Sequence, residues 1–342
     1  MSSSPVDTPE VAPGKSPARA VTLAQLAKHV GVSSAAVSVV LNNTESRIKV
    51  SESTRQRILE AARELNYQPN ALARSLMKRQ TNVIGFCSAL TRMLDPMHPF
   101  LGALLQGMLA GCRDHEKNLM LYSRIAAISE NDLYLEVLNG QLDGLILFAH
   151  ETSLFTERLV ESHLPVITVA DSVPGFPCVA VDDDLGGRLL ARYLADKGYK
   201  RALFWAPYKF SSSAERRCAS YVDEATQLGL EVEAYRNTRP IELALQEIMS
   251  RPSPPQVISV NSDYVAFDVI NGLKSIGLQV PNDVAITGFD GVPASYPGYT
   301  TVYAPWRDVA QIAVSLLMKQ CDGQDIPMNT TLPVELVAGE TA

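Results

Sequence analysis

One face of a short predicted helix carries the side chains best suited to contact another molecule. Over residues 34–42 the apolar positions gather on one side: Ala36, Val37, Val40 and Leu41. The opposite side carries small polar and apolar residues: Ser34, Ala35, Ser38, Val39 and Asn42. Hydroxyl and amide groups can hydrogen-bond to the edges of DNA bases, and small apolar groups can contact the methyl group of thymine. We therefore expect this face to lie in the major groove of DNA.

A preceding helix is expected to hold this reading helix in place. Its apolar residues recur at the spacing of one helical face: Leu23, Leu26, Ala27 and Val30. Thr22 and Gln25 can form a capping box at its start, and Gly31 is expected to end it. Ser33 or Ser34 can then cap the reading helix.

A third helix is expected to begin at Ser53, whose hydroxyl group can form a second capping box with Gln56. Three apolar residues then close a small core: Ile58, Ala62 and Leu65. Two helices joined by a tight glycine-containing turn form a helix-turn-helix unit, which reads DNA through its second helix. The alternative is a three-helix bundle with no role on DNA, because the bare pattern is only moderately specific.

The distribution of charge favours the DNA-binding interpretation. The 342-residue chain has a formal net charge of −7. Residues 20–79 contain nine Lys and Arg against four Glu, a charge of +5, and residues 1–19 sum to zero, which leaves −12 for residues 80–342. A basic segment on an acidic remainder is typical of a protein that contacts phosphate groups with one end only.

Length and composition set further bounds on the class of protein. A chain of 342 residues is expected to contain at least two domains. No uncharged apolar run of about 18 residues occurs, so no membrane partner is expected. Residues 1–20 are rich in Ser and Pro and lack the apolar core of a secretory signal, so we interpret them as a disordered tail.

Residues that could bind a metal or perform catalysis form no recognisable set. The five cysteines are scattered, and we interpret them as reduced interior thiols of a cytoplasmic protein. The five histidines show no metal-ligand spacing. Asp182, Asp183 and Asp184 could suggest a metal site, but a strand that runs into a helix N-terminus explains them better. No nucleophile elbow or Walker loop occurs, so we expect no enzyme, no cofactor and no metal.

After residue 80, short β-rich runs alternate with amphipathic helical runs. A first series extends to about residue 170, a second begins near Cys178 and reaches Asp290, and residues 331–342 are expected to form a last strand with a short tail. Such βαβ series form parallel sheets with helices on both faces. Two successive doubly wound units imply two lobes, and ligands bind such sheets at the carboxyl ends of their strands, in the cleft between the lobes.

The order of motifs along the chain resembles the LacI (lactose repressor) family of transcription regulators. The first part carries TL..LA...GVS...VS..LN and then VS..TR..I..AA.ELNY.PN..AR.L. The body is similar to the family's sensor domain, which is related to periplasmic sugar-binding proteins. The matching runs are HPFLGALLQGM at 98–108, DGLIL at 143–147, GYKRALF at 198–204, ERRCASY at 215–221, SDYVAFD at 262–268 and PNDVAITGFDGVPASYPGYTTVYAPW at 281–306. The resemblance covers about nine tenths of the 342 residues.

The resemblance implies a DNA-binding head, a hinge helix and an effector-binding body. The implied DNA-binding residues are Thr22, Ser33, Ser34, Ala35, Ser38, Val39, Asn42, Tyr67, Asn70, Ala73 and Leu76. Residues 70–80 are too few for a stable isolated helix. The family pattern implies that two copies in a homodimer fold together on the DNA, with Leu76 of each copy inserted into the minor groove.

The resemblance also implies the residues around the effector: Phe100, Arg217, Asp263, Asp290 and Trp306. An arginine fork and a carboxylate can hold vicinal hydroxyl groups or a ring nitrogen, and an aromatic face can stack on a sugar or a base. Each residue also has a plain structural explanation. Arg217 could form a surface ion pair, Asp290 could form a turn after a buried strand, and both aromatic residues could belong to the core.

Three features depart from the family pattern. Val39 stands where an arginine is common, and valine cannot form a bidentate bond to guanine. We therefore expect an operator read more through thymine contacts and DNA shape. His98 stands where an asparagine is common, and Asp171 lies one residue later than the family's acidic position. The last two features leave the identity of the effector open.

These observations predict a small all-α helix-turn-helix head on an α/β two-lobed body with parallel doubly wound sheets. The expected domains are a tail at 1–20, a head at 21–67, a hinge helix and linker at 68–80, and an effector-binding and dimerisation domain at 81–342. The expected function is a cytoplasmic repressor of double-stranded operator DNA, controlled by a sugar or related metabolite. A solute-binding protein of a transport system is the alternative, but that function does not explain the predicted DNA-binding residues 21–79. No leucine heptad follows the body, so a dimer and not a tethered tetramer is expected.

Overall fold

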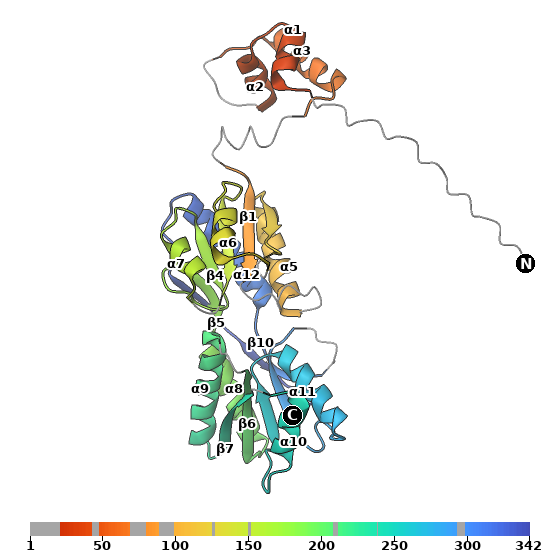
Figure 1. The fold of residues 1–342 in the computed structure, drawn as a ribbon, viewed down its shortest axis with the longest axis vertical. Helices are drawn as coiled ribbons and strands as arrows, with labels where there is room; N and C mark the ends of the chain where they lie inside the picture. The colour runs from red at the N-terminus through yellow and green to blue at the C-terminus, as the bar shows by residue number, and fades with distance from the viewer. Residues whose placement is uncertain are drawn as a thin grey trace, which may run out of the picture. The chain divides into compact units, whose positions relative to one another are not determined.

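The computed structural model of the chain divides into two compact units, Met1–Arg79 and Gln80–Ala342. It describes residues 21–42, 48–68, 80–88, 99–124, 127–149, 152–207, 211–237, 239–292 and 298–342. Three predicted elements lie outside these residues: the tail at 1–20, the hinge positions Asn70, Ala73 and Leu76, and His98. We call the first unit the head and the second unit the sensor (Figure 1).

The first two helices of the head form the predicted helix-turn-helix. Helix α1 (Leu23–Val30) begins with the Thr22–Gln25 capping box, and Gly31 ends it in the left-handed conformation with φ 77°. Helix α2 (Ser34–Asn42) is capped by Ser33, whose Oγ accepts a hydrogen bond of 3.2 Å from the backbone N–H of Ala36. The two helices meet at a bend of 105°, which is typical of a helix-turn-helix.

The third helix begins earlier than the sequence suggested. Helix α3 (Glu52–Glu64) has Ser51 as its N-cap, and the Ser51 hydroxyl accepts from the backbone N–H of Thr54. The predicted capping box of Ser53 with Gln56 is therefore wrong, because Ser53 already lies in the first helical turn. Leu26, Val37 and Ile58, one from each helix, are fully buried and form the centre of the head's core.

The sensor contains two six-stranded sheets, which define its two lobes. The sheet of lobe 1 has the order β11-β5-β4-β3-β1-β2. Its strands are β1 (Val83–Ser88), β2 (Asn118–Leu121), β3 (Gly144–Phe148), β4 (Val166–Val169), β5 (Cys178–Val181) and β11 (Asn329–Leu332). Neighbouring strands of this sheet pair in parallel throughout.

The sheet of lobe 2 has the order β12-β10-β9-β8-β6-β7. Its strands are β6 (Arg201–Pro207), β7 (Glu231–Asn237), β8 (Val257–Val260), β9 (Ala285–Asp290), β10 (Thr300–Tyr303) and β12 (Glu335–Val337). All pairs are parallel except β10 with β12, which is an antiparallel edge pair. The two doubly wound sheets confirm the predicted fold class.

Helices cover both faces of each sheet (Figure 1). In lobe 1, α5 (Pro99–Asp114) and α12 (Trp306–Cys321) pack on one face, and α6 (Glu130–Val137) and α7 (Leu154–Val160) pack on the other. In lobe 2, α8 (Asp183–Asp196) and α9 (Ser212–Gln227) lie opposite α10 (Ile241–Met249) and α11 (Asp263–Ser275).

The chain passes between the lobes more than once, which the sequence did not predict. The second series was expected to begin near Cys178, but β5 belongs to the sheet of lobe 1. After β10 the chain returns to lobe 1 to form α12 and β11, and it then crosses again to form β12 in lobe 2. The expected single last strand is thus two short strands in different lobes, because residues 329–337 pair with β5 and then with β10.

All five cysteines are free thiols. Four of them are buried, whereas Cys321 is exposed and so is not the interior thiol that was expected.

Among the residues that the structure describes, no single helix is long and apolar enough to cross a membrane.

Candidate functional site

Polar side chains gather where the strands of the two sheets end. Asp171 lies just after β4, Asp183 begins α8 shortly after β5, Asn261 follows β8, and Asp290 is the last residue of β9. The carboxyl ends of parallel strands are where doubly wound folds bind ligands. The sequence predicted Asp290 as a site residue, but it did not predict the other three.

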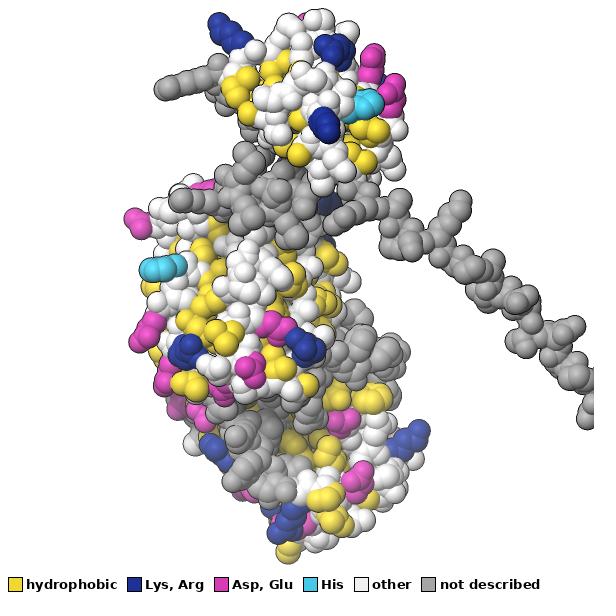
Figure 2. Space-filling view, turned by 45° about the horizontal axis from the view of Figure 1, so that its top comes forward, with side chains coloured by type: hydrophobic (Ala, Val, Ile, Leu, Met, Phe, Trp, Pro, Cys, Tyr) yellow, Lys and Arg dark blue, Asp and Glu magenta, His cyan; other side chains and the backbone are white. Residues whose placement is uncertain are grey.

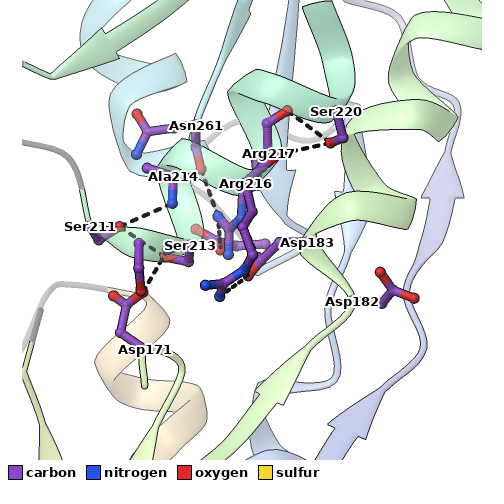
Figure 3. A network of polar contacts seen from close by, with 12 residues as sticks. Asp171, Asp182, Asp183, Ser211, Ser213, Ala214, Arg216, Arg217, Ser220 and Asn261 are labelled. Carbon is purple, nitrogen blue, oxygen red and sulfur yellow. Dashed lines mark hydrogen bonds and ion pairs between the residues drawn. The ribbon is translucent and has the colours of Figure 1, made fainter. Parts of the chain in front are cut away.

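Arg217 is the centre of this group (Figure 3). Its Nε donates a hydrogen bond of 2.7 Å to Oδ1 of Asp183, and its Nη1 donates one of 2.7 Å to the main-chain oxygen of Asn261. The same Nη1 lies 3.6 Å from Oδ1 of Asp290. The guanidinium also lies over the ring of Phe289, 3.5 Å from its centroid. Because Arg217 is buried, the surface ion pair that was its alternative explanation is excluded.

Asp183 binds two arginines. Its Oδ2 accepts from Nη2 of Arg216 at 2.6 Å, and its Oδ1 accepts from Arg217, so both guanidinium groups converge on one buried carboxylate (Figure 3). The predicted explanation of the acidic run holds for Asp182, which caps α8 by accepting from the backbone N–H of Leu185. The signal for Asp183 was this same acidic run, but nothing local in the sequence indicated its arginine partners.

Asp290 is held by Trp306 as well as by Arg217. The indole Nε1 of Trp306 donates a hydrogen bond of 3.1 Å to Oδ1 of Asp290. Burial raises the pKa of the Asp290 carboxyl to about 7, and the positive charge of Arg217 acts against this rise. Asp290 has φ 119°, a strained conformation for a residue with a side chain, and such strain is often found at functional sites.

Asp263 lies behind Asp290 and is almost completely buried. Its Oδ1 accepts from the hydroxyl of Thr301 at 2.7 Å, and its Oδ2 accepts from the backbone N–H of Gly291 at 2.8 Å. Burial and the nearby Asp290 carboxyl raise the pKa of Asp263 to about 8. These contacts hold the turn that follows Asp290, and Asp263 is therefore close to the other predicted residues without pointing toward open space.

Phe100 and Trp306 meet edge to face, with ring centroids 4.8 Å apart and planes at 78°. Phe100 also contacts Phe148 at a centroid distance of 5.5 Å. Phe100 lies in the first turn of α5 and Trp306 begins α12, and both are buried in a core cluster that continues into lobe 2. Trp306 is a core residue, which was one of its two interpretations, and its N–H group contacts Asp290.

Asp171 links the two lobes directly. Its Oδ1 accepts from the hydroxyl of Ser212 at 2.9 Å and from the backbone N–H of Ser213 at 2.7 Å, both in the first turn of α9 (Figure 3). Asp171 has no exposed surface. The preceding Ala170 adopts φ 68°, which is uncommon for alanine and turns the chain at the end of β4.

In the head, the predicted reading face is available to a partner. Ser34 and Ala35 are exposed, and Ser38 and Val39 are half-buried. Thr22 and Ser33 are bound into the helix caps, and Tyr67 packs against the core. Asn42 is the last residue of α2. Figure 2 shows single Lys and Arg side chains on the head, with Asp and Glu side chains on the same face.

The fold and these groups define a class of protein, a helix-turn-helix head joined to a two-lobed ligand sensor. Comparison with known families agrees. Residues 22–70 match the family described as bacterial regulatory proteins, lacI family, and residues 191–342 match the periplasmic binding protein-like domain.

Individual relatives extend over nearly the whole chain. The ribose operon repressor of Escherichia coli strain K12 is 30% identical over 311 residues, which are 87% of this chain and 92% of the relative. Catabolite control protein A of Priestia megaterium is 29% identical over 90% of this chain and 94% of the relative. A crystal structure of the lac repressor dimer bound to operator and an anti-inducer has a TM-score of 0.77 at 23% identity, over 94% of this chain and 99% of that one.

The chain belongs to the lacI family of bacterial regulatory proteins. It is a DNA-binding transcriptional repressor whose affinity for its operator is controlled by a small-molecule effector. The family consists of transcription regulators and not of enzymes. The alternative of a transport solute-binding protein is not favoured, because the DNA-binding family model covers residues 22–70.

Proposed function

We propose that the exposed face of α2 reads the operator in the major groove, with Ser34, Ala35, Ser38, Val39 and Asn42 toward the bases. The exposure of Ser34 and Ala35 supports this proposal. Short side chains reach only the nearest groups of the bases, so thymine methyl contacts and DNA shape contribute most of the specificity. Thr22, Ser33 and Tyr67 contact the phosphate backbone at the edges of this face. A guanine opposite Val39 in the selected consensus, unexplained by any other residue, would count against this reading.

We also propose that two copies bind the operator together in the cytoplasm. Heads of a dimer then contact half-sites about 34–36 Å apart. Asn70, Ala73 and Leu76 of each copy form the hinge in the minor groove, where Leu76 acts as a wedge that bends the DNA. Leu76→Ala should weaken specific binding far more than nonspecific binding at the same salt concentration. Leu243→Ala, on an exposed leucine of α10, is the control. Equal losses of the two kinds of binding would reject the wedge.

For the sensor, we propose that the effector binds at the strand ends between the lobes and contacts Arg217, Asp290, Phe100 and Trp306. The observation that carries this proposal is the buried Arg217, which lies between the carboxylates of Asp183 and Asp290 at the carboxyl ends of the strands. Asp263 contributes by holding Gly291 and thereby the position of Asp290.

We propose a sugar as the effector. Carboxylates and a guanidinium together accept and donate hydrogen bonds, which suits a ring with several hydroxyl groups, and an indole gives it an apolar face. The names of similar proteins support this class. They include the ribose operon repressor, a CelR–cellobiose complex and a related protein complexed with D-xylulofuranose.

Two experiments on the full chain test the proposed function. Selection of DNA duplexes from a random pool at about 0.15 M salt should yield a twofold-symmetric consensus, because nonspecific attraction is then largely screened. Binding of that consensus is then measured with D-ribose, D-xylulose or cellobiose, and at least one sugar should change the affinity. Recovery of no consensus under any of these conditions would contradict the proposal for α2. A consensus whose binding no sugar alters would contradict the proposed effector class.

A further inference from the structure

Asn261 carries a buried polar atom that no described residue satisfies. Its side-chain Oδ1 is buried and has no hydrogen-bond partner among the described residues. A buried acceptor without a partner destabilises a folded protein, because water no longer solvates it and nothing replaces the water. Such atoms are rare in native structures, and each requires an explanation.

The position of Asn261 suggests that explanation. It directly follows β8, which lies between β9 and β6 near the middle of the sheet of lobe 2. The neighbouring strand β9 ends at Asp290. Asn261 therefore stands at the edge of the sheet where the effector is proposed to bind.

The main chain of Asn261 is fixed on both sides. Its carbonyl oxygen accepts the 2.7 Å hydrogen bond from Nη1 of Arg217. The next residue, Ser262, is the N-cap of α11 and accepts from the backbone N–H of Val265. The side chain of Asn261 is thus attached to a rigid support, as is typical of groups that recognise a ligand.

A purely structural role does not account for the asparagine. Any residue at position 261 would offer the same main-chain oxygen to Arg217. The side chain adds an amide, and in Figure 3 this amide points away from the guanidinium of Arg217. Its oxygen is buried and accepts no hydrogen bond from the described residues.

We propose that Asn261 is a specificity-determining residue whose Oδ1 accepts a hydrogen bond from a hydroxyl group of the effector. This inference rests on the proposed effector site and adds a residue that neither the motifs nor the charge pattern indicated. A neutral acceptor suits a hydroxyl group, which can donate to it while Arg217 and Asp290 bind other oxygens of the same molecule. A site that depends on such a bond discriminates strongly against an analogue that lacks the donor.

The first test needs no effector. Asn261→Ala removes the unsatisfied oxygen, so the full chain without added sugar should unfold at the same temperature as the unaltered protein or higher. Asn271→Ala, at an exposed position of α11 in the same lobe, is the matched control. A drop of more than about 2 °C relative to this control would show that the amide stabilises the fold, and it would overturn the inference.

The second test uses D-ribose and its 2-deoxy, 3-deoxy and 5-deoxy analogues, with binding followed by tryptophan fluorescence. For the unaltered protein, one deoxy analogue should bind at least about tenfold more weakly than D-ribose. In Asn261→Ala that difference in affinity should disappear, because the variant has no Oδ1 to accept a hydrogen bond from the hydroxyl group of D-ribose. An unchanged preference in the variant would overturn the inference. If D-ribose does not bind the unaltered protein, D-ribose is excluded as the effector, and the unfolding comparison still tests whether the amide of Asn261 stabilises the fold.

Discussion

The carboxylate of Asp171 in lobe 1 accepts a hydrogen bond of 2.7 Å from the backbone N–H of Ser213 in lobe 2. A second bond of 2.9 Å from the hydroxyl of Ser212 strengthens the contact. The positive end of the α9 dipole also favours a carboxylate at this point. Because α9 carries Arg217 one turn later, the contact between the lobes and the proposed effector site share one helix.

We expect Asp171→Asn to weaken the association of the lobes. The amide oxygen of asparagine is neutral, so it accepts weaker hydrogen bonds than the charged carboxylate does. Hydrogen bonds to charged groups contribute roughly 1.5–3 kcal/mol, so the separation of the lobes should become measurable. Small-angle scattering should show a larger radius of gyration, and the operator affinity should change with it. Asp196→Asn, at the exposed end of α8, is the control. Identical scattering and operator binding in both variants would show that this contact does not hold the lobes together.

The acidic pair of Asp263 and Asp290 should make the sensor less stable as the pH rises. Burial raises both folded-state pKa values, to about 8 and about 7, from the 3.8 of an unperturbed Asp. The folded protein therefore binds a proton more tightly than the unfolded chain does. The resulting stability is fully present below about pH 4 and is lost as the pH rises through 7 and 8.

The measurement is the unfolding temperature of the full chain between pH 6 and pH 9. It should fall over this range, and the fall should become smaller in Asp290→Asn, which removes one of the two charges. Asp196→Asn again provides a control, since it leaves the buried pair intact. A flat profile in the unaltered protein, or the same fall in both variants, would assign the pH dependence to other groups.

Arg217→Ala should destabilise the sensor as well as abolish the response to the effector. The substitution leaves the buried carboxylate of Asp183 without one of its two partners, and the loss of one member of a buried ion pair costs roughly 3–5 kcal/mol. Arg192→Ala is the matched control, because Arg192 pairs with Glu224 on the surface between the same helices and should have little effect. Urea unfolding measures the stabilities. Equal stabilities of the two variants would mean that the buried pair contributes no more than a surface pair.

Ser51→Ala and Ser53→Ala should have different effects on the head. Ser51 caps α3, and the loss of a serine N-cap typically costs about 1 kcal/mol, whereas Ser53 lies in the first turn of the helix. Hydrogen exchange of the α3 amides in the full chain measures the local stability. Faster exchange in Ser53→Ala than in Ser51→Ala would reverse the assignment of the cap.

The head could be predicted closely because its signals are local. The Thr22–Gln25 capping box, the break at Gly31 and the inward turn of Val37 and Val40 each depend on residues within one or two helical turns. The cap of α3 is the exception, because the sequence spacing favoured Ser53, whereas Ser51 forms the cap. The alternation of strands and helices likewise predicted two parallel sheets, since it depends only on the order of elements along the chain.

What only the tertiary structure decided is which distant residues meet. Asp183 pairs with Arg216 and Arg217, more than thirty positions further on, because α8 and α9 pack side by side. Asp171 in lobe 1 meets Ser213 in lobe 2, and the buried Oδ1 of Asn261 has no hydrogen-bond partner among the described residues. The sequence by itself determined the order of helices and strands and the family. The partners of the buried charges and the repeated passage of the chain between the lobes depend on pairing of segments far apart in sequence, and no local pattern encodes such pairing.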